Sequence, residues 1–198
     1  TLHAFGADEF TPIPQKWIYW IIERILDLGT DVYFCPSNYM KLYGKRTFVI
    51  NYKKCRVVYN SLPLKEPPNN LREISEQFKK SNNIKEDEVL FLFCGRIERQ
   101  KGVDVLIKAF ARVNTEINAR LIICGEGEDM TSMMELADSK NVSSNIIWAG
   151  WQTNLDSYYS AADVYIMPSR WESFGLVFLE AMNYSLPSRE LIANSIET

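Results

Sequence analysis

Short apolar stretches alternate with amphipathic stretches through the second half of the chain, and this alternation constrains the fold more than any other feature. The apolar stretches, predicted to be strands, are residues 89–94, 119–124, 145–149 and 162–167. The amphipathic stretches, predicted to be helices, are residues 71–81, 103–113, 130–139, 153–161 and those from 176. Largely apolar strands that alternate with amphipathic helices indicate a parallel sheet covered on both faces. The fold class is therefore α/β, and such sheets bind ligands at the carboxyl ends of their strands.

The first third of the chain predicts a smaller unit. Pro14 suits the first turn of a helix and Gly29 suits its end, while Ser37 suits the N-cap position of a second helix. Two further apolar stretches, at 31–36 and 55–59, predict short strands.

Residues 64–70 separate the two regions. Their sequence, Leu-Lys-Glu-Pro-Pro-Asn-Asn, has adjacent prolines and paired asparagines, which favour an extended connection without a helix. We therefore expect a first domain at 1–63, a linker at 64–70 and a second domain at 71–198.

Composition excludes several classes of protein. A net charge of −3 gives no basic surface for nucleic acid, so no nucleic-acid partner is expected. The apolar run at 17–22 is too short to cross a membrane. With one histidine and four cysteines, none in a Cys-x-x-Cys pair, neither a zinc site nor a redox motif is expected. Cys94 and Cys124 are expected to be small buried core residues in a reducing cytosol.

Two glutamates, Glu172 and Glu180, flank a predicted turn between a strand and a helix. The strand ends at Pro168, Gly175 lies in the turn, and the helix opens at Leu176. A helix that starts after such a turn exposes N–H groups that bind anions. Because carboxylates repel phosphate, the two glutamates should face a neutral, hydroxyl-rich part of a ligand, and a sugar nucleotide has that layout. The alternative is an ordinary strand–helix connection with two solvated glutamates.

A charged segment flanked by glycines, residues 95–102, follows the strand at 89–94 and opens the next helix. Its sequence is Gly-Arg-Ile-Glu-Arg-Gln-Lys-Gly. The glycines allow the backbone to approach a ligand closely, and Arg96 and Lys101 bring two cations to a helix N-terminus. This combination suits a diphosphate. The alternative is a solvated charged loop.

Both segments resemble motifs of one family, the retaining glycosyltransferases of GT-B fold, family 4, or glycosyl transferases group 1. In the family's Glu-x7-Glu signature, Pro-Ser precedes Glu-x-Phe-Gly-Leu and then Glu-Ala-Met. This chain has Pro168-Ser169, Glu172-Ser-Phe-Gly-Leu176 and Glu180-Ala-Met182, and residues 95–102 look like the family's Gly-Arg-x4-Lys-Gly element. The resemblance implies a GT-B-like fold of two Rossmann-like units, the first partial here and the second a doubly wound parallel sheet.

The resemblance also implies how a donor would be held. Glu172 is expected to bind hydroxyls of the transferred sugar, and Glu180 the ribose hydroxyls. The backbone N–H groups of Phe174, Gly175 and Leu176 are expected to serve the sugar and the β-phosphate.

Four residues make up the expected catalytic set. Arg96 and Lys101 would hold the diphosphate and stabilise the charge that grows on it as it leaves. Family members carry a histidine at the end of a strand in the acceptor-side domain, and His3 stands in the corresponding place. Glu172 completes the set.

Two further turns are similar to parts of the family's donor cleft. Gly125 and Gly127 follow the strand at 119–124 and resemble a Gly-x-Gly turn that lines the cleft. Gly150 and Trp151 match a turn that often meets the nucleotide base. These four residues are expected to contribute to donor binding.

The implied reaction transfers a hexosyl group from a nucleotide-diphosphate sugar to a hydroxyl of a glycan, lipid or small-molecule acceptor, with retention of configuration. No Asp-x-Asp pair, which holds a metal in the other major glycosyltransferase fold, occurs in the chain. Neither a metal nor another cofactor is therefore expected.

A cytoplasmic location is expected. The aromatic helix at 16–25 and the lysines near it are compatible with peripheral contact at the inner membrane surface and equally with plain solvated surface.

The likeness runs from Thr1 to about Pro187 and covers about half of a full family member, so the chain is expected to be truncated at both ends. Residues 188–198 are interpreted as a short amphipathic tail. Two alternatives to an active transferase therefore stay open. One is a catalytically inactive module that binds a sugar nucleotide, and the other is a module that binds a partner through the helix at 16–25.

Overall fold

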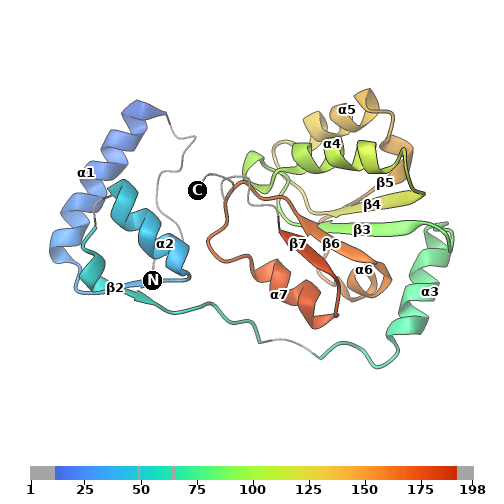
Figure 1. The fold of residues 1–198 in the computed structure, drawn as a ribbon, viewed down its shortest axis with the longest axis horizontal. Coiled ribbons are helices and arrows are strands. Elements are labelled where there is room, and N and C mark those ends of the chain that lie inside the picture. Colours follow the sequence, from blue (N-terminus) through green and yellow to red (C-terminus); the bar gives the residue numbers. More distant parts are fainter. Residues whose placement is uncertain (1–11, 49, 64–65, 191–198) are drawn as a thin grey trace. The chain divides into compact units, whose positions relative to one another are not determined.

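The computed structural model describes residues 12–48, 50–63 and 66–190. They form two compact units, whose elements are labelled in Figure 1. One unit contains the residues up to Leu62 together with Ser173–Gly175, and the other contains Pro63–Glu172 and the residues from Leu176 on. The division at Leu62 lies beside the segment predicted to be a linker. The functional roles assigned to the two domains stay predictions.

The first unit is a small α/β arrangement. Its elements are α1 (Ile13–Gly29), β1 (Tyr33–Cys35), α2 (Asn38–Tyr43), a π-helix (Gly44–Phe48), a 3-10 helix (Tyr52–Lys54) and β2 (Cys55–Val57). The two strands pair in parallel. The predicted N-cap is confirmed, because Ser37 Oγ accepts a hydrogen bond of 3.2 Å from Met40 N. Buried side chains of Cys35, Phe48 and Cys55 belong to the core of this unit.

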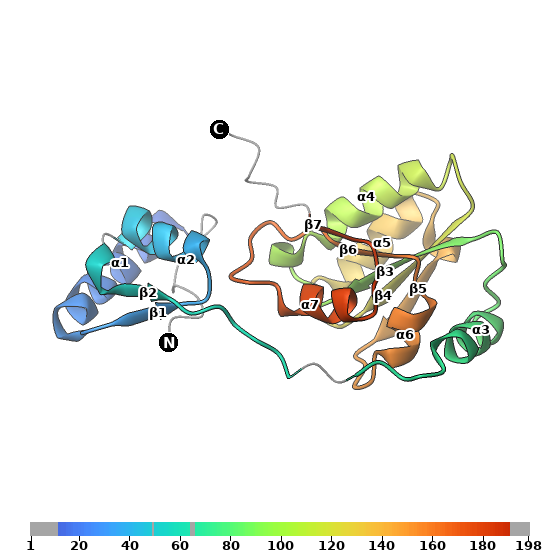
Figure 2. The ribbon, with the colours of Figure 1, turned by 60° about the horizontal axis from the view of Figure 1, so that its bottom comes forward.

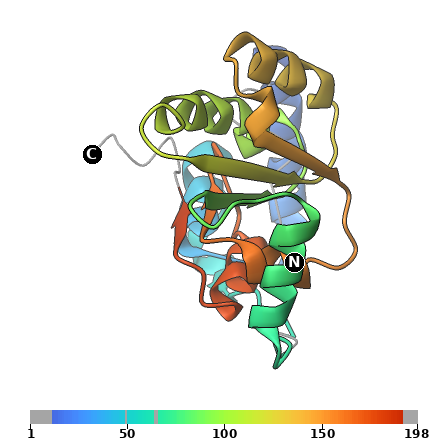
Figure 3. The same cartoon turned by 90° about the vertical axis from the view of Figure 1, so that its right-hand side faces the viewer.

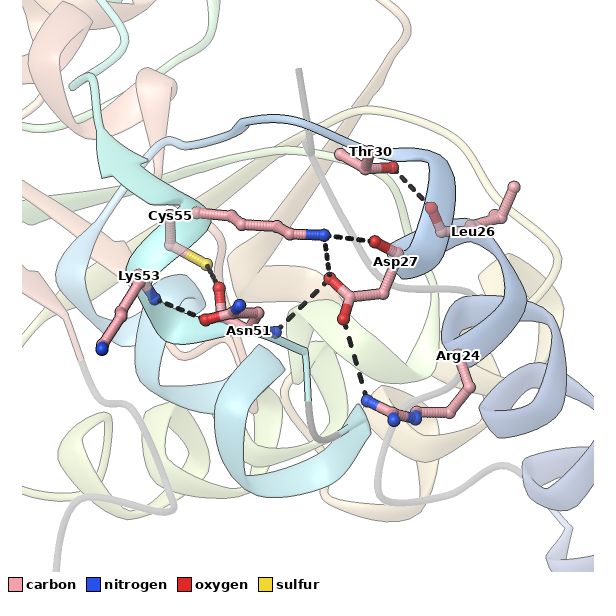
Figure 4. A network of polar contacts seen from close by, with 8 residues as sticks. Arg24, Leu26, Asp27, Thr30, Asn51, Lys53 and Cys55 are labelled. Atoms are coloured by element: carbon pink, nitrogen blue, oxygen red, sulfur yellow. Dashed lines mark hydrogen bonds and ion pairs between the residues drawn. The ribbon is translucent and has the colours of Figure 1, made fainter.

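A buried carboxylate joins the end of α1 to the start of β2 in this unit (Figure 4). Asp27 forms ion pairs of 3.7 Å with both Arg24 and Lys54, and Asp27 Oδ1 accepts a hydrogen bond of 3.4 Å from Asn51 N. Lys54 Nζ also donates to the carbonyl oxygen of Asp27. Since a buried charge is tolerated only where it is paired, these contacts explain how Asp27 is accommodated.

The second unit is a five-stranded parallel sheet with helices on both faces (Figures 1 and 2). Its strands are β3 (Val89–Cys94), β4 (Ala119–Cys124), β5 (Ile146–Gly150), β6 (Val164–Met167) and β7 (Ser188–Glu190). Its helices are α3 (Leu71–Ser81), α4 (Val103–Val113), α5 (Met130–Ser139), α6 (Asp156–Ala161) and α7 (Leu176–Asn183). The strand order is β5-β4-β3-β6-β7. The chain therefore runs outward from β3 in one direction and returns to β6 on the other side of β3, and this switch point is where doubly wound sheets bind ligands.

The sheet separates two apolar cores. Figure 3 shows α4 and α5 on one face and α3, α6 and α7 on the other. The first face buries Leu106, Ile107 and Phe110 of α4 against β3 and β4, and the second buries Tyr159 and Tyr165 with their neighbours. Cys94 and Cys124 are buried core residues, as predicted.

Two predictions of secondary structure were wrong. Residues 188–190, interpreted as part of an amphipathic tail, form β7, which pairs in parallel with β6. The strand was missed because Ser-Arg-Glu has no apolar pattern, while its backbone pairs with β6 at the edge of the sheet. The helix expected from 153 starts instead at Asp156, where Asn154 Oδ1 accepts a hydrogen bond of 2.9 Å from Asp156 N.

Gly125 is required where the turns after β3 and β4 meet. Its φ is +140°, and a Cβ placed on it would lie 1.9 Å from Gly95 O. A Gly125→Ala substitution is therefore expected to lower the free energy of unfolding by more than about 1 kcal/mol, measured by denaturant titration. Gly29→Ala is the matched control, because nothing lies within 4 Å of a Cβ there. Equal stability of the two variants would contradict this account.

Candidate functional site

The loops that follow β3, β4 and β5 are joined by backbone hydrogen bonds at the carboxyl edge of the sheet. Gly95 N donates to Cys124 O at 3.0 Å, and Gly125 N donates to Gly150 O at 2.7 Å. The loops continue side by side, since Ile97 N donates to Glu126 O at 2.9 Å. The glycine turns found in the sequence therefore lie along one edge.

The structure brings Lys101 and Glu172 into direct contact. Lys101 ends a 3-10 helix (Arg99–Lys101) after β3, and Glu172 lies in the loop after β6. Lys101 Nζ donates to Glu172 Oε1, and Ser169 Oγ donates to the same oxygen at 3.0 Å. The two charged side chains are 14% and 10% exposed. Because β3 and β6 are neighbours at the switch of strand order, this pair marks the place where such a sheet binds its ligand.

The contacts of Glu172 occupy one of its two carboxylate oxygens. Within the described part of the chain, the two side chains that donate hydrogen bonds to Glu172, Lys101 and Ser169, both donate to Oε1. Oε2 is the oxygen left to accept a hydrogen bond from a ligand hydroxyl. The Lys101 ammonium group thus lies beside a carboxylate whose second oxygen can accept a hydrogen bond.

Glu180 is held by a tyrosine of a neighbouring helix. It lies in α7, and its Oε2 accepts a hydrogen bond of 3.0 Å from the hydroxyl of Tyr159 in α6. Burial raises the pKa of Tyr159 well above its ordinary value, and the nearby Glu180 carboxylate raises it further, so the phenol stays a donor. Tyr159 therefore fixes the orientation of this carboxylate.

Tyr165 connects the surroundings of the two glutamates. This β6 residue is fully buried, and its hydroxyl donates to Cys94 O at 3.4 Å. Burial raises the pKa of Tyr165, and the carboxylates of Glu172 and Glu180 both contribute to the increase. Both glutamates therefore act electrostatically on the same hydroxyl.

The other predicted residues lie at or near this edge without touching the glutamates. Arg96 follows β3, its side chain is 66% exposed, and it forms an ion pair of 3.0 Å with Glu98. Trp151 is 65% exposed, and its backbone N–H donates to Glu126 Oε1 at 3.4 Å. Gly127 lies in the turn after β4, where a Cβ would meet Ile97 O at 2.1 Å.

The turn before α7 carries the remaining expected donors. Leu176 is the first residue of α7, so its N–H belongs to the first turn, where N–H groups have no partner within the helix. Phe174 and Gly175 directly precede it. His3 lies outside the described residues.

Several residues that shape the site were given no role by the sequence analysis of the motifs. They are Ser169, which contacts Glu172; Tyr159, which contacts Glu180; and Arg170 and Asp104, which pair with each other. Ser169 belongs to the glutamate motif and Arg170 directly follows it, and that position was the one available signal. Tyr159 and Asp104 give no signal in the sequence, because their partners are distant along the chain.

Comparison with known proteins identifies the family. The family described as glycosyl transferases group 1 matches residues 74–188, which is more than half of the chain. The chain belongs to this family. The match includes the Arg96–Lys101 segment and both glutamates.

Relatives of this group 1 chain are longer than the chain itself. An uncharacterized 41.2 kDa protein in the cps region of Klebsiella pneumoniae is 34% identical over 200 residues, which cover 99% of the chain and 51% of the relative. The N-acetyl-alpha-D-glucosaminyl L-malate synthase of Bacillus anthracis is 31% identical over 111 residues, which cover 56% of the chain and 29% of the synthase. The chain therefore spans about half the length, or less, of these curated relatives.

A solved structure confirms the predicted α/β fold of GT-B type. The chain is similar to Anabaena Alr3699/HepE in complex with UDP-glucose, with a TM-score of 0.81 and 16% identity. The likeness covers 100% of this chain and 55% of that chain. Among the described helices, none combines the length and apolar character that crossing a bilayer requires.

Proposed function

We propose that the second unit binds a nucleotide-diphosphate sugar, and that the whole protein transfers the hexosyl group to an acceptor hydroxyl with retention of configuration. The observation that carries this proposal is the meeting of Lys101 and Glu172 at the switch between β3 and β6. An ammonium group there suits a phosphate, and a carboxylate oxygen beside it suits a sugar hydroxyl. A nucleotide-diphosphate sugar has both groups next to each other.

Each residue is assigned one part of the donor. Glu172 accepts hydrogen bonds from the transferred sugar, and Glu180, oriented by Tyr159, accepts them from the ribose. The Lys101 ammonium and the exposed Arg96 guanidinium bind the diphosphate. The N–H group of Leu176, at the start of α7, serves the sugar and the β-phosphate.

The turns after β4 and β5 complete the donor site. Gly125 and Gly127 bring backbone close to the ligand. Gly150 and Trp151 meet the base, and the exposed indole offers an aromatic surface for it.

The chemistry requires charge stabilisation more than proton transfer by a side chain. As the bond between the anomeric carbon and the phosphate oxygen breaks, the bonding electrons pass to the diphosphate. The acceptor oxygen forms the new bond on the same face, and its proton passes to the departing phosphate oxygen. Lys101 and Arg96 are placed to stabilise that growing negative charge, an effect that is strongest for donors already in position. We also propose His3, which lies outside the described residues, as a fourth catalytic residue.

The relatives support the donor class and leave the acceptor open. The Anabaena structure contains UDP-glucose, and the Bacillus anthracis enzyme is a synthase of an N-acetylglucosaminyl compound. We therefore propose a uridine-diphosphate sugar as donor and a glycan, lipid-linked or small-molecule acceptor. No metal is assigned a role in binding.

A binding experiment tests the proposal. Calorimetry with uridine, guanosine and adenosine diphosphate sugars, each with and without a chelator, is expected to show one preferred base and no effect of the chelator. The matching nucleoside monophosphate is the control, and it should bind about tenfold or more weakly because it lacks the phosphate assigned to Lys101. Equal affinity for the monophosphate would overturn the assignment of the diphosphate site.

An assay of sugar transfer separates the enzyme from its alternative. Binding of a donor without transfer to any acceptor class would favour an inactive sugar-nucleotide-binding module.

The aromatic helix α1 supports a separate proposal of peripheral membrane contact, because Trp17 is 62% and Leu28 is 82% exposed. Sedimentation with anionic and neutral vesicles tests it, and equal recovery in the two pellets would contradict a role for anionic lipid.

A further inference from the structure

Besides the Lys101–Glu172 contact, four polar contacts join the segment that carries Lys101 to the loop that carries Glu172. The backbone N–H of Arg170 donates to Gln100 O at 2.7 Å, and Gln100 Nε2 donates to Trp171 O at 3.0 Å. Arg170 Nη1 donates to Arg99 O at 2.7 Å. The fourth contact is the ion pair between Arg170 and Asp104, the second residue of α4.

The ion pair has the two-pronged geometry that gives arginine–carboxylate contacts their strength. Arg170 Nη1 lies 2.8 Å from Asp104 Oδ1, and Arg170 Nη2 lies 2.9 Å from Asp104 Oδ2. The side chains are only 20% and 24% exposed. Burial disfavours the charged form of Asp104, but the Arg170 guanidinium and the Lys108 ammonium together outweigh it and lower the pKa of the Asp104 carboxyl below its ordinary value. The pair is therefore charged at neutral pH.

The backbones of the two loops also touch. Gly102 has a φ of +66°, and a Cβ placed on it would lie 2.1 Å from Pro168 O. The loops can approach this closely only because residue 102 has no side chain. The polar contacts therefore join two loops whose backbones are already in direct contact.

We propose that Arg170 and Asp104 are positioning residues, which clamp the loop after β3 to the loop after β6 and so hold the Lys101 ammonium against the Glu172 carboxylate. Neither residue contacts Lys101 or Glu172 directly. The Arg170 side chain instead holds Arg99 O and Asp104, which flank Lys101 in the sequence, and Arg170 itself lies two positions before Glu172. The functional consequence rests on the proposed donor-binding role, while the clamp itself does not.

The first test needs no donor. In the full chain, Lys101 is mostly buried and ion-paired, so its amine is expected to react slowly in reductive methylation followed by mass spectrometry. Arg170→Gln and Asp104→Asn should each raise the labelling rate of Lys101 by about tenfold, a loss of about 1.4 kcal/mol of coupling. Labelling of the exposed Lys140 should not change. Unchanged labelling of Lys101 in both variants would overturn the clamp, whatever the chain binds.

The second test asks whether the clamp acts through Lys101. Arg170→Gln should weaken binding of the preferred nucleoside diphosphate by about tenfold, and adding Lys101→Gln should weaken it no more than Lys101→Gln alone. A merely structural role would give losses that add, and this outcome would overturn positioning. Arg170→Lys keeps the charge without the two-pronged geometry and should recover part of the affinity.

A matched control removes an ion pair elsewhere. Arg72→Gln breaks the exposed pair with Glu76 on α3 and should change neither Lys101 labelling nor affinity. If the wild-type chain binds no nucleoside diphosphate, the proposed function fails, and the labelling experiment still decides the clamp.

Discussion

A Glu172→Gln variant is expected to lose the preference of the chain for a nucleotide-diphosphate sugar over the corresponding nucleoside diphosphate. Glutamine keeps an oxygen that can accept from Ser169 and removes the charge that pairs with Lys101. A hydrogen bond between a sugar hydroxyl and the carboxylate contributes about 1.5–3 kcal/mol. The affinity for the sugar donor should therefore fall by about 10- to 150-fold, measured by calorimetry. In the whole protein, sugar transfer should fall at least as much.

The nucleoside diphosphate serves as the internal control for this variant. It lacks the sugar, so its affinity should fall much less, and removing a negative charge beside the phosphate site partly offsets the loss of the Lys101 contact. Glu76→Gln, which neutralises an exposed carboxylate on α3, should change neither affinity. Equal losses for the sugar donor and the diphosphate would mean that Glu172 organises Lys101 and does not contact the sugar. Loss of cooperative unfolding would mean that its role is structural.

The sequence predicted the second unit well because its elements are long and strongly patterned. The strands at 89–94 and 119–124 and the helix at 103–113 have the predicted bounds. Each element is either largely apolar or apolar on one face, so the pattern of burial indicates its structure. β7 has neither property. Three polar residues become a strand because β6 offers a free edge, and that depends on the fold already being formed.

The same distinction applies to the site: local motifs were found from the sequence, and contacts that depend on the fold were not. Lys101 and Glu172 were found because glycine turns and helix starts mark ligand-binding backbone, and a family resemblance supplied their roles. Their contact with each other, across 71 positions of sequence, was not predicted. The same separation hides the pairing of Arg170 with residues 99–104, since nothing in the sequence shows that β6 lies beside β3. Motifs indicate the residues that we propose to bind the donor, and the topology determines which of them meet.

Neutralising the two cations after β3 is expected to weaken diphosphate binding to different extents, because Lys101 is mostly buried and Arg96 is exposed. Lys101→Gln keeps a donor for Glu172 and removes the charge, so affinity for the nucleoside diphosphate should fall by about 10- to 150-fold. Arg96→Gln removes a charge that is 66% exposed, and its effect should be smaller at physiological salt. The double variant should lose all measurable binding. Calorimetry at several salt concentrations provides the measurement.

The salt dependence distinguishes the two cations more sharply than the size of either loss. Added salt screens an exposed charge strongly and a buried one weakly. The effect of Arg96→Gln should therefore shrink as salt rises, while the effect of Lys101→Gln should persist. Lys140→Gln, which removes an exposed lysine from the end of α5, should have no effect at any salt concentration. If the double variant bound the diphosphate as tightly as the wild type, neither cation would belong to a donor site, and the partner-binding alternative would take its place.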